Sequence, residues 1–228
     1  MYLSKRRTPA QVVVGDIPRE PRGFVTRHLL NHRAEASKHK LVAVVYVVNG
    51  LRGVGKTQVA AAYARFCVAI GWGLVGWVNA RTFDSLLAGL ARVAERLGVA
   101  DPEGDSLNSA RLLRDHLNTR TDPGLLVFGN ATDPDGLRPL LPATGGIQVV
   151  ITSTDQSFAE FGEAIHVPPF SREQSLGYLR ERTGLDDEVN ANVVAADQVP
   201  SEFVRTTRAA LVNYLRLHGE PIVSTDGF

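Results

Sequence analysis

An apolar run, a glycine-rich octapeptide and a helical pattern follow one another near the start of this chain, and their order restricts the fold. Residues 41–48 are almost all apolar and largely β-branched, which is typical of a central parallel strand covered on both faces. Residues 50–57 read Gly-Leu-Arg-Gly-Val-Gly-Lys-Thr. Small and apolar residues at helical spacing then continue from 56 to 70. Strand, glycine loop and helix in this order predict a loop that binds phosphate.

The octapeptide fits the pattern G-x-x-x-x-G-K-[ST]. Its glycines let successive backbone N–H groups converge on phosphate oxygens, while the positive end of the following helix points at the same place. Lys56 adds a charge between the terminal phosphates, and Thr57 supplies a hydroxyl to Mg²⁺. A glycine-rich turn with an exposed lysine is the alternative, but such a turn need not join a buried strand to a helix. We expect nucleotide contacts from Gly50, Leu51, Arg52, Gly53, Val54, Gly55, Lys56, Thr57 and Gln58.

Strand and helix patterns alternate beyond this loop. Helices are predicted at 83–97 and about 106–120, and further strands at 74–78, 125–128, 148–152 and 164–167. Strands separated by helices predict an α/β fold with a doubly wound, parallel, five-stranded sheet. Helical patterns without strands follow Pro168 and Pro169. We expect an N-terminal extension at 1–22, a P-loop nucleotide-binding domain at 23–168 and a small, partial helical subdomain at 169–228.

Composition argues against several classes of binding partner. The chain has 25 basic and 24 acidic side chains, a formal net charge of +1, so no broad field would gather nucleic acid or anionic lipid. No apolar run approaches the roughly 20 residues that span a bilayer, and we expect a soluble cytoplasmic protein. Cys67 is the only cysteine and lies in an apolar helix pattern, which favours a buried, inert thiol. His28 and His32 lack suitable partners for a metal site.

The acidic residue that usually accompanies such a loop has no obvious equivalent. P-loop enzymes place an aspartate at the end of a later apolar strand, where it holds the metal and its waters. Here Gly129 and Asn130 follow the strand at 125–128, and neither is a carboxylate. Asp133 and Asp135 come next, but Asp133 before a proline first predicts a turn or a helix start. We therefore assign no catalytic residue and expect slow or absent hydrolysis.

These segments resemble the NB-ARC domain of the STAND class of P-loop regulatory ATPases, in the actinobacterial type associated with tetratricopeptide repeats. The resemblance covers about residues 16–215 and weakens after 185. Its phosphate loop matches at 49–57, its "LLVLDNA" segment at 125–131, the stretch that follows at 137–142, and its sensor strand at 150–153. Phe24, Val25 and Arg27 resemble part of the "FVGRE" motif that lies against adenine, and Pro200 stands where "GLPL" is expected.

The resemblance implies further contacts and a role. Phe24, Val25, Arg27 and Pro200 would contact ADP or ATP, bound with Mg²⁺. The domain would act as a nucleotide-dependent switch that signals to effector or repeat domains of a longer protein or of partner chains, with a nucleotide-dependent homo-oligomer as one outcome.

The departures from the family pattern keep other functions open. Gly129 stands where the family has its metal-ordering aspartate, and Thr154 where many members have a sensor arginine. The family's winged-helix domain has no counterpart before Phe228, so we expect a nucleotide-binding core separated from a longer switch protein. The alternatives are an active P-loop NTPase or kinase, and a nucleotide-free pseudo-ATPase that serves as an interaction scaffold. Guanine specificity is disfavoured because residues 152–155 lack the Asn-Lys pair that it needs.

Overall fold

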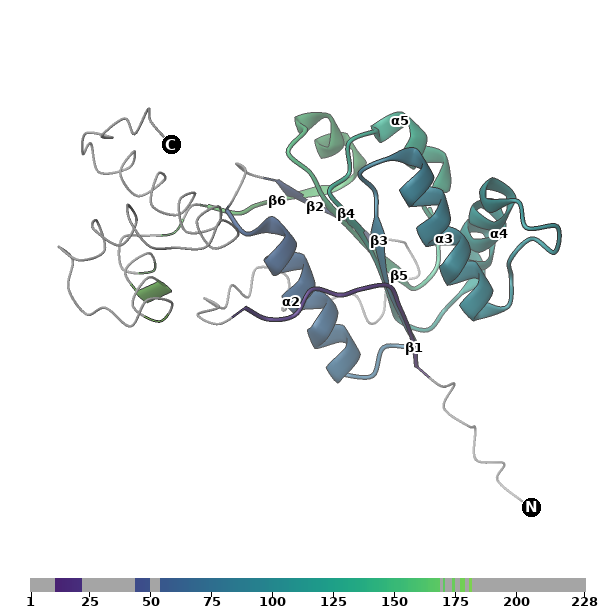
Figure 1. The fold of residues 1–228 in the computed structure, drawn as a ribbon, viewed down its shortest axis with the longest axis horizontal. Helices are drawn as coiled ribbons and strands as arrows, with labels where there is room; N and C mark the ends of the chain where they lie inside the picture. The colour runs from purple at the N-terminus through teal and green to yellow at the C-terminus, as the bar shows by residue number, and fades with distance from the viewer. Residues whose placement is uncertain are drawn as a thin grey trace, which may run out of the picture.

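The computed structural model describes residues 11–21, 44–49 and 54–168, with single residues at 170, 174, 177, 178 and 181 (Figure 1). Strands and helices alternate along this part of the chain. The elements are β1 (Val12–Val14), β2 (Val44–Asn49), α2 (Lys56–Ala69), β3 (Leu74–Asn79), α3 (Phe83–Leu97), α4 (Ser106–Thr119), β4 (Gly124–Gly129), α5 (Pro134–Leu137), η1 (Arg138–Leu140), β5 (Ile147–Thr152), η2 (Gln156–Phe161) and β6 (Glu163–His166).

The strands form one parallel sheet in the order β1-β3-β4-β5-β2-β6. The predicted doubly wound architecture is confirmed, and each of the five predicted strands is present within three residues of its predicted bounds. The sixth strand, β1, pairs with β3 from Val12 opposite Leu74 to Val14 opposite Gly76. The sequence did not predict it, because three apolar residues are too few to show a strand pattern.

Helices cover both faces of the sheet (Figure 1). Helix α2 packs on one face, over a buried cluster that includes Leu125 and Val127 of β4. Helices α3 and α4 pack on the other face, over a cluster that includes Leu126 and Phe128 of the same strand. Successive side chains of a strand point to opposite faces, so a continuous apolar run supplies both cores.

The segment before β2 is attached to α2 as well as to β3. The side-chain amide of Gln11 donates to the carbonyl oxygens of Val68 and Trp72, at 3.0 and 2.9 Å. The guanidinium of Arg65 donates to the carbonyl oxygen of Pro18 at 2.6 Å. Ile17 packs against the cluster under α2. Residues 11–18, part of the region predicted as an extension, therefore contribute to the body of the domain.

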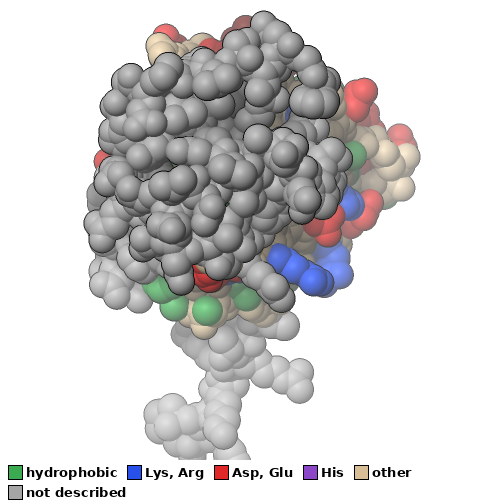
Figure 2. All heavy atoms as spheres, turned by 60° about the vertical axis from the view of Figure 1, so that its left-hand side comes forward, with side chains coloured by type: hydrophobic (Ala, Val, Ile, Leu, Met, Phe, Trp, Pro, Cys, Tyr) green, Lys and Arg blue, Asp and Glu red, His purple; other side chains and the backbone are tan. Residues whose placement is uncertain are grey.

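Charges on the described surface are mixed. Basic and acidic side chains lie close together on the visible described part of the face in Figure 2, which agrees with the near-zero net charge of the chain. Within the described ranges, no helix is both long and apolar enough to cross a membrane.

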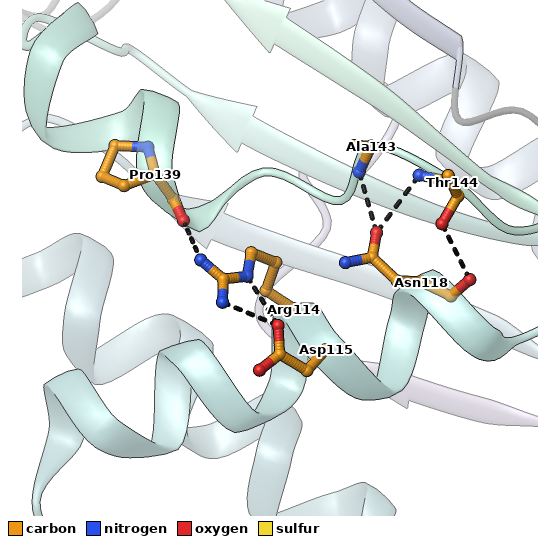
Figure 3. A network of polar contacts seen from close by, with 6 residues as sticks. All are labelled: Arg114, Asp115, Asn118, Pro139, Ala143 and Thr144. Carbon is orange, nitrogen blue, oxygen red and sulfur yellow. Dashed lines mark hydrogen bonds and ion pairs between the residues drawn. The ribbon is translucent and has the colours of Figure 1, made fainter.

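The connection from η1 to β5 is hydrogen-bonded to α4 (Figure 3). The side-chain oxygen of Asn118 accepts the backbone N–H groups of Ala143 and Thr144, at 2.8 and 3.1 Å. The guanidinium of Arg114 donates to the carbonyl oxygen of Pro139 at 2.8 Å. The Arg114 bond holds η1 to α4, and the Asn118 bonds hold the segment that leads into β5, the strand that lies between β2 and β4.

Gly145 in this connection provides a stability test. Its φ is +91°, and an added Cβ would lie 2.4 Å from the carbonyl oxygen of Leu117. Gly98 is a matched control, because its φ is +71° but an added Cβ would meet nothing within 4 Å. Gly98→Ala should cost about 1 kcal/mol of unfolding free energy through its backbone conformation alone. Gly145→Ala should cost at least about 2 kcal/mol, because the backbone must also move. Urea unfolding measures both, and equal losses would contradict the close approach at Gly145.

Candidate functional site

The start of α2 lies where the sequence predicts the phosphate loop to end. Gly55 is the N-cap of this 14-residue helix and has a left-handed backbone, with φ 93° and ψ 20°. Glycine adopts this conformation without the penalty that other residues incur. In the part of the chain that the structure describes, no side chain caps the helix, and its first turn carries no acidic residue. No carboxylate of the first turn therefore neutralises the positive end of α2.

The residues after Gly55 sit at the amino end of α2. Val54, just before it, is buried at 6% exposure in the cluster under the helix. Lys56, Thr57 and Gln58 are half-buried in the first turn. The Oε1 atom of Gln58 is buried without a hydrogen-bond partner. Buried polar groups are nearly always paired, and this oxygen accepts hydrogen bonds, so a donor would complete it and a phosphate oxygen would not.

The other eight predicted contact residues lie outside the described part of the chain: Gly50, Leu51, Arg52, Gly53, Phe24, Val25, Arg27 and Pro200. The predicted helical subdomain also lies outside it, apart from the single residues after 168.

Gly129 ends β4 on the face of the sheet that carries α2. It follows Val127 by two residues, and Val127 belongs to the cluster under α2. An added Cβ would lie 3.6 Å from Nε1 of Trp77 and 3.7 Å from the carbonyl oxygen of Val78, which are ordinary contacts. Gly129 also lacks a positive φ. Neither backbone conformation nor crowding at Cβ requires glycine here, so a Cβ would fit.

The loop after β4 is hydrogen-bonded to the end of β5. The backbone N–H of Asn130 donates to the hydroxyl oxygen of Thr152 at 2.9 Å, and the hydroxyl of Ser153 donates to the carbonyl oxygen of Ala131 at 2.7 Å. Asn130 has a φ of 57°, which is uncommon outside glycine but tolerated by asparagine. Thr152 and Ser153 are 1% and 2% exposed. These bonds give the carboxyl edge of the sheet a fixed shape beside Gly129.

Two nearby carboxylates cap helices. Asp133 accepts the backbone N–H of Gly136 at 3.0 Å and begins α5, so the predicted helix start is confirmed. Asp155 accepts the backbone N–H of Ser157 at 2.9 Å, a bond that lowers the pKa of this carboxyl group. Among the described residues there is no group of three or more His, Cys, Asp or Glu side chains that could hold a metal ion.

A polar contact under α2 connects the helix to the sheet. The hydroxyl of Tyr63 donates to the side-chain oxygen of Gln148 on β5, which is 2% exposed. Burial raises the pKa of Tyr63 far above its ordinary value, so this hydroxyl keeps its proton. Burial also raises the pKa of Cys67 to about 12, so the thiol stays protonated at neutral pH. Cys67 is buried as predicted.

Comparison with solved structures gives the fold. The chain is similar to Cdc6p from Pyrobaculum aerophilum, with a TM-score of 0.51, 15% identity, and coverage of 86% of this chain and 65% of that chain. It is also similar to AMPPCP-bound DnaA from Aquifex aeolicus, with a TM-score of 0.47, 14% identity, and coverage of 86% and 63%. For domain III of the replication initiation protein DnaA from Thermotoga maritima, the TM-score is 0.42 and the identity 14%, with coverage of 88% and 90%.

The fold is that of P-loop NTPases, as the parallel sheet, the helices on both faces and the first of these similarities show. The chain spans 65% and 63% of the length of the first two structures. No protein-family model matches the chain, and no curated protein matches it significantly. The NB-ARC resemblance is not confirmed by these comparisons, so the particular role is a matter for proposal.

Proposed function

We propose that this chain is the ADP- or ATP-binding domain of a regulatory switch of the NB-ARC, STAND type, with slow or absent hydrolysis. The observation that carries the proposal is the start of α2. A left-handed glycine opens a 14-residue helix that no described side chain caps, directly before Lys56 and Thr57. A helix end of this kind binds anions through its free N–H groups and its dipole.

Different residues would bind different parts of the nucleotide. The N–H groups at the start of α2 and the Lys56 ammonium would bind the phosphates, because both are positive and both follow the glycine loop. The Thr57 hydroxyl would contact the metal ion that accompanies the phosphates. A bound metal ion would supply charge neutralisation at the terminal phosphate. Phe24, Val25, Arg27 and Pro200 are proposed contacts to the nucleoside, by the family resemblance.

Hydrolysis would need more than these residues provide. A water must be oriented and the metal held in place against the terminal phosphate. Gly129 has no side chain for either task, and Asn130 has an amide that cannot take a proton at neutral pH. Asp133 and Asp155 already cap helices, and Asp135 lies in the first turn of α5. Tight binding with little turnover is the behaviour of a switch, in which the identity of the nucleotide sets the state.

The switch would be read by other parts of a larger assembly. We propose a nucleotide-binding domain at 23–168, extended by β1, and a helical subdomain at 169–228 that folds over the nucleotide. Effector or repeat domains, in the same protein or in partner chains, would respond to the orientation of these two parts. Nucleotide-dependent self-association is a second expected output. An active NTPase would instead release phosphate steadily, and a pure scaffold would not bind nucleotide.

Replacement of Lys56 tests nucleotide binding. Lys56→Ala should lower ADP affinity by about a hundredfold or to below detection, because charge-assisted bonds to the phosphates are lost. The melting temperature without ligand should change little. Arg92→Ala is the matched control, because Arg92 is an exposed cation on α3, the helix on the opposite face of the sheet. Titration calorimetry with ADP measures all three proteins. Equal affinity in Lys56→Ala and the unchanged protein would contradict the proposal.

Insertion of a carboxylate at Gly129 tests why turnover is slow. Gly129→Asp should fold, since an added Cβ lies no closer than 3.6 Å to its neighbours. ADP affinity should stay nearly constant, because the start of α2 holds the phosphates. The rate of single-turnover ATP cleavage should rise by about 10–100-fold, and this rate should depend more strongly on Mg²⁺. A cleavage rate equal to that of the parent at saturating Mg²⁺ would show that the missing carboxylate is not the limit.

A further inference from the structure

Trp77 occupies the space beside the missing carboxylate. It lies on β3, and its ring packs against the buried cluster under α2, so it is on the same face as Gly129. Its Nε1 atom is 3.6 Å from the position that a Cβ at Gly129 would take. Strand β3 is paired with β4 in register, so Trp77 is opposite Val127, two residues before Gly129, and the 3.6 Å distance shows that its ring reaches toward the carboxyl end of β4. The Nε1 atom therefore lies near the carboxyl edge of the sheet. The phosphate loop leaves the same edge from β2, which β4 and β5 separate from β3.

The indole N–H of Trp77 is available. The ring is partly exposed, and none of the hydrogen bonds between residues of the described ranges involves this N–H group. Trp72, the other tryptophan of the chain, differs in both position and burial. It precedes β3 at the opposite edge of the sheet, is 4% exposed, and makes an edge-on contact with the ring of Tyr63. Trp72 thus serves as an internal control.

A donor in place of a carboxylate changes what the site can hold. A carboxylate only accepts hydrogen bonds, so it can bind the waters of a hydrated metal ion. An indole N–H only donates, so it cannot bind those waters through their hydrogens. It can donate directly to a phosphate oxygen, and bonds to ionised acceptors are the stronger kind. At this position the indole N–H favours binding of the phosphate itself over binding of a hydrated metal ion that bridges to the phosphate.

We propose that Trp77 takes the place of the missing acid as a phosphate-binding residue, so that the site holds a nucleoside diphosphate without requiring Mg²⁺. The inference rests on the proposed nucleotide binding. It assigns to Trp77 a specificity role that neither the P-loop pattern nor the family resemblance contains. The phosphate would lie between the start of α2 on one side and the indole N–H on the other.

Two single-tryptophan proteins test the inference by fluorescence. In Trp72→Phe, Trp77 is the only indole, and ADP added in the presence of EDTA should change its emission. Pyrophosphate should cause the same change and adenosine should not, because the contact is to phosphate. In Trp77→Phe, Trp72 is the only indole, and its emission should not respond. Phenylalanine keeps an aromatic ring in the core but removes the N–H group.

Calorimetry on the same proteins gives a second measurement. ADP affinity of the unchanged protein should differ by less than about threefold between EDTA and Mg²⁺, whereas a site that needs an outer-shell carboxylate shows a loss of about 10–100-fold. Trp77→Phe should weaken ADP binding in EDTA by about tenfold or more, and Trp72→Phe should not.

The outcomes separate this inference from the proposed function. The role of Trp77 would be overturned if ADP binding required Mg²⁺, if the emission of Trp77 did not respond to ADP, and if Trp77→Phe bound ADP as tightly as the unchanged protein. Those results would leave the proposed nucleotide site intact. If the unchanged protein binds neither ADP nor pyrophosphate under any condition, both proposals are wrong. If Trp77→Phe fails to fold, the emission of Trp77 in Trp72→Phe still decides the question.

Discussion

The packing of α2 against the sheet is the interaction on which the rest of the site depends. Val59, Ala60, Tyr63, Ala64 and Cys67 form its buried face, and together with β2, β4 and β5 they fix the axis of the helix. The buried hydrogen bond from the Tyr63 hydroxyl to Gln148 is a polar contact in this otherwise apolar interface, and it restricts how the helix is oriented on the sheet. Because the axis is fixed, the positive amino end of α2 is fixed as well, and the proposed phosphate-binding point would exist before any ligand arrives.

The two halves of the site differ in chemistry. At the start of α2 the chain offers a glycine N-cap, a first turn that no described side chain caps, and a lysine, all suited to an anion. At the end of β4, where a metal-ordering acid would stand, Gly129 leaves an open Cβ position and Trp77 brings an N–H donor. The backbone of the loop after β4 is bonded to Thr152, so this end has a defined shape despite lacking the acid. Under the proposed function, the donors on both sides would hold phosphate well, and the lack of an acid would leave water poorly activated.

The sequence predicted the fold because its strongest signals are local. Continuous apolar runs marked β2, β4 and β5, and periodic helices such as α3 stood out by their spacing, so these elements were placed within a few residues. The motif at 50–57 marked the start of α2. Strand β1 was not predicted because Val12–Val14 has only three residues and gains its stability from pairing with β3, which is a long-range contact. The position of Trp77 beside Gly129 also depends on register between strands that are some fifty residues apart, and no local pattern encodes it.

The central claim is that this chain binds an adenine nucleotide and keeps it. Mass spectrometry of the small molecules released from freshly purified protein, after extensive dialysis against EDTA, tests this claim most directly. The account predicts ADP at close to one molecule per chain, because the phosphate contacts come from the protein and not from a metal ion. Protein that releases no nucleotide, and that takes up none when ADP is added back, would contradict it.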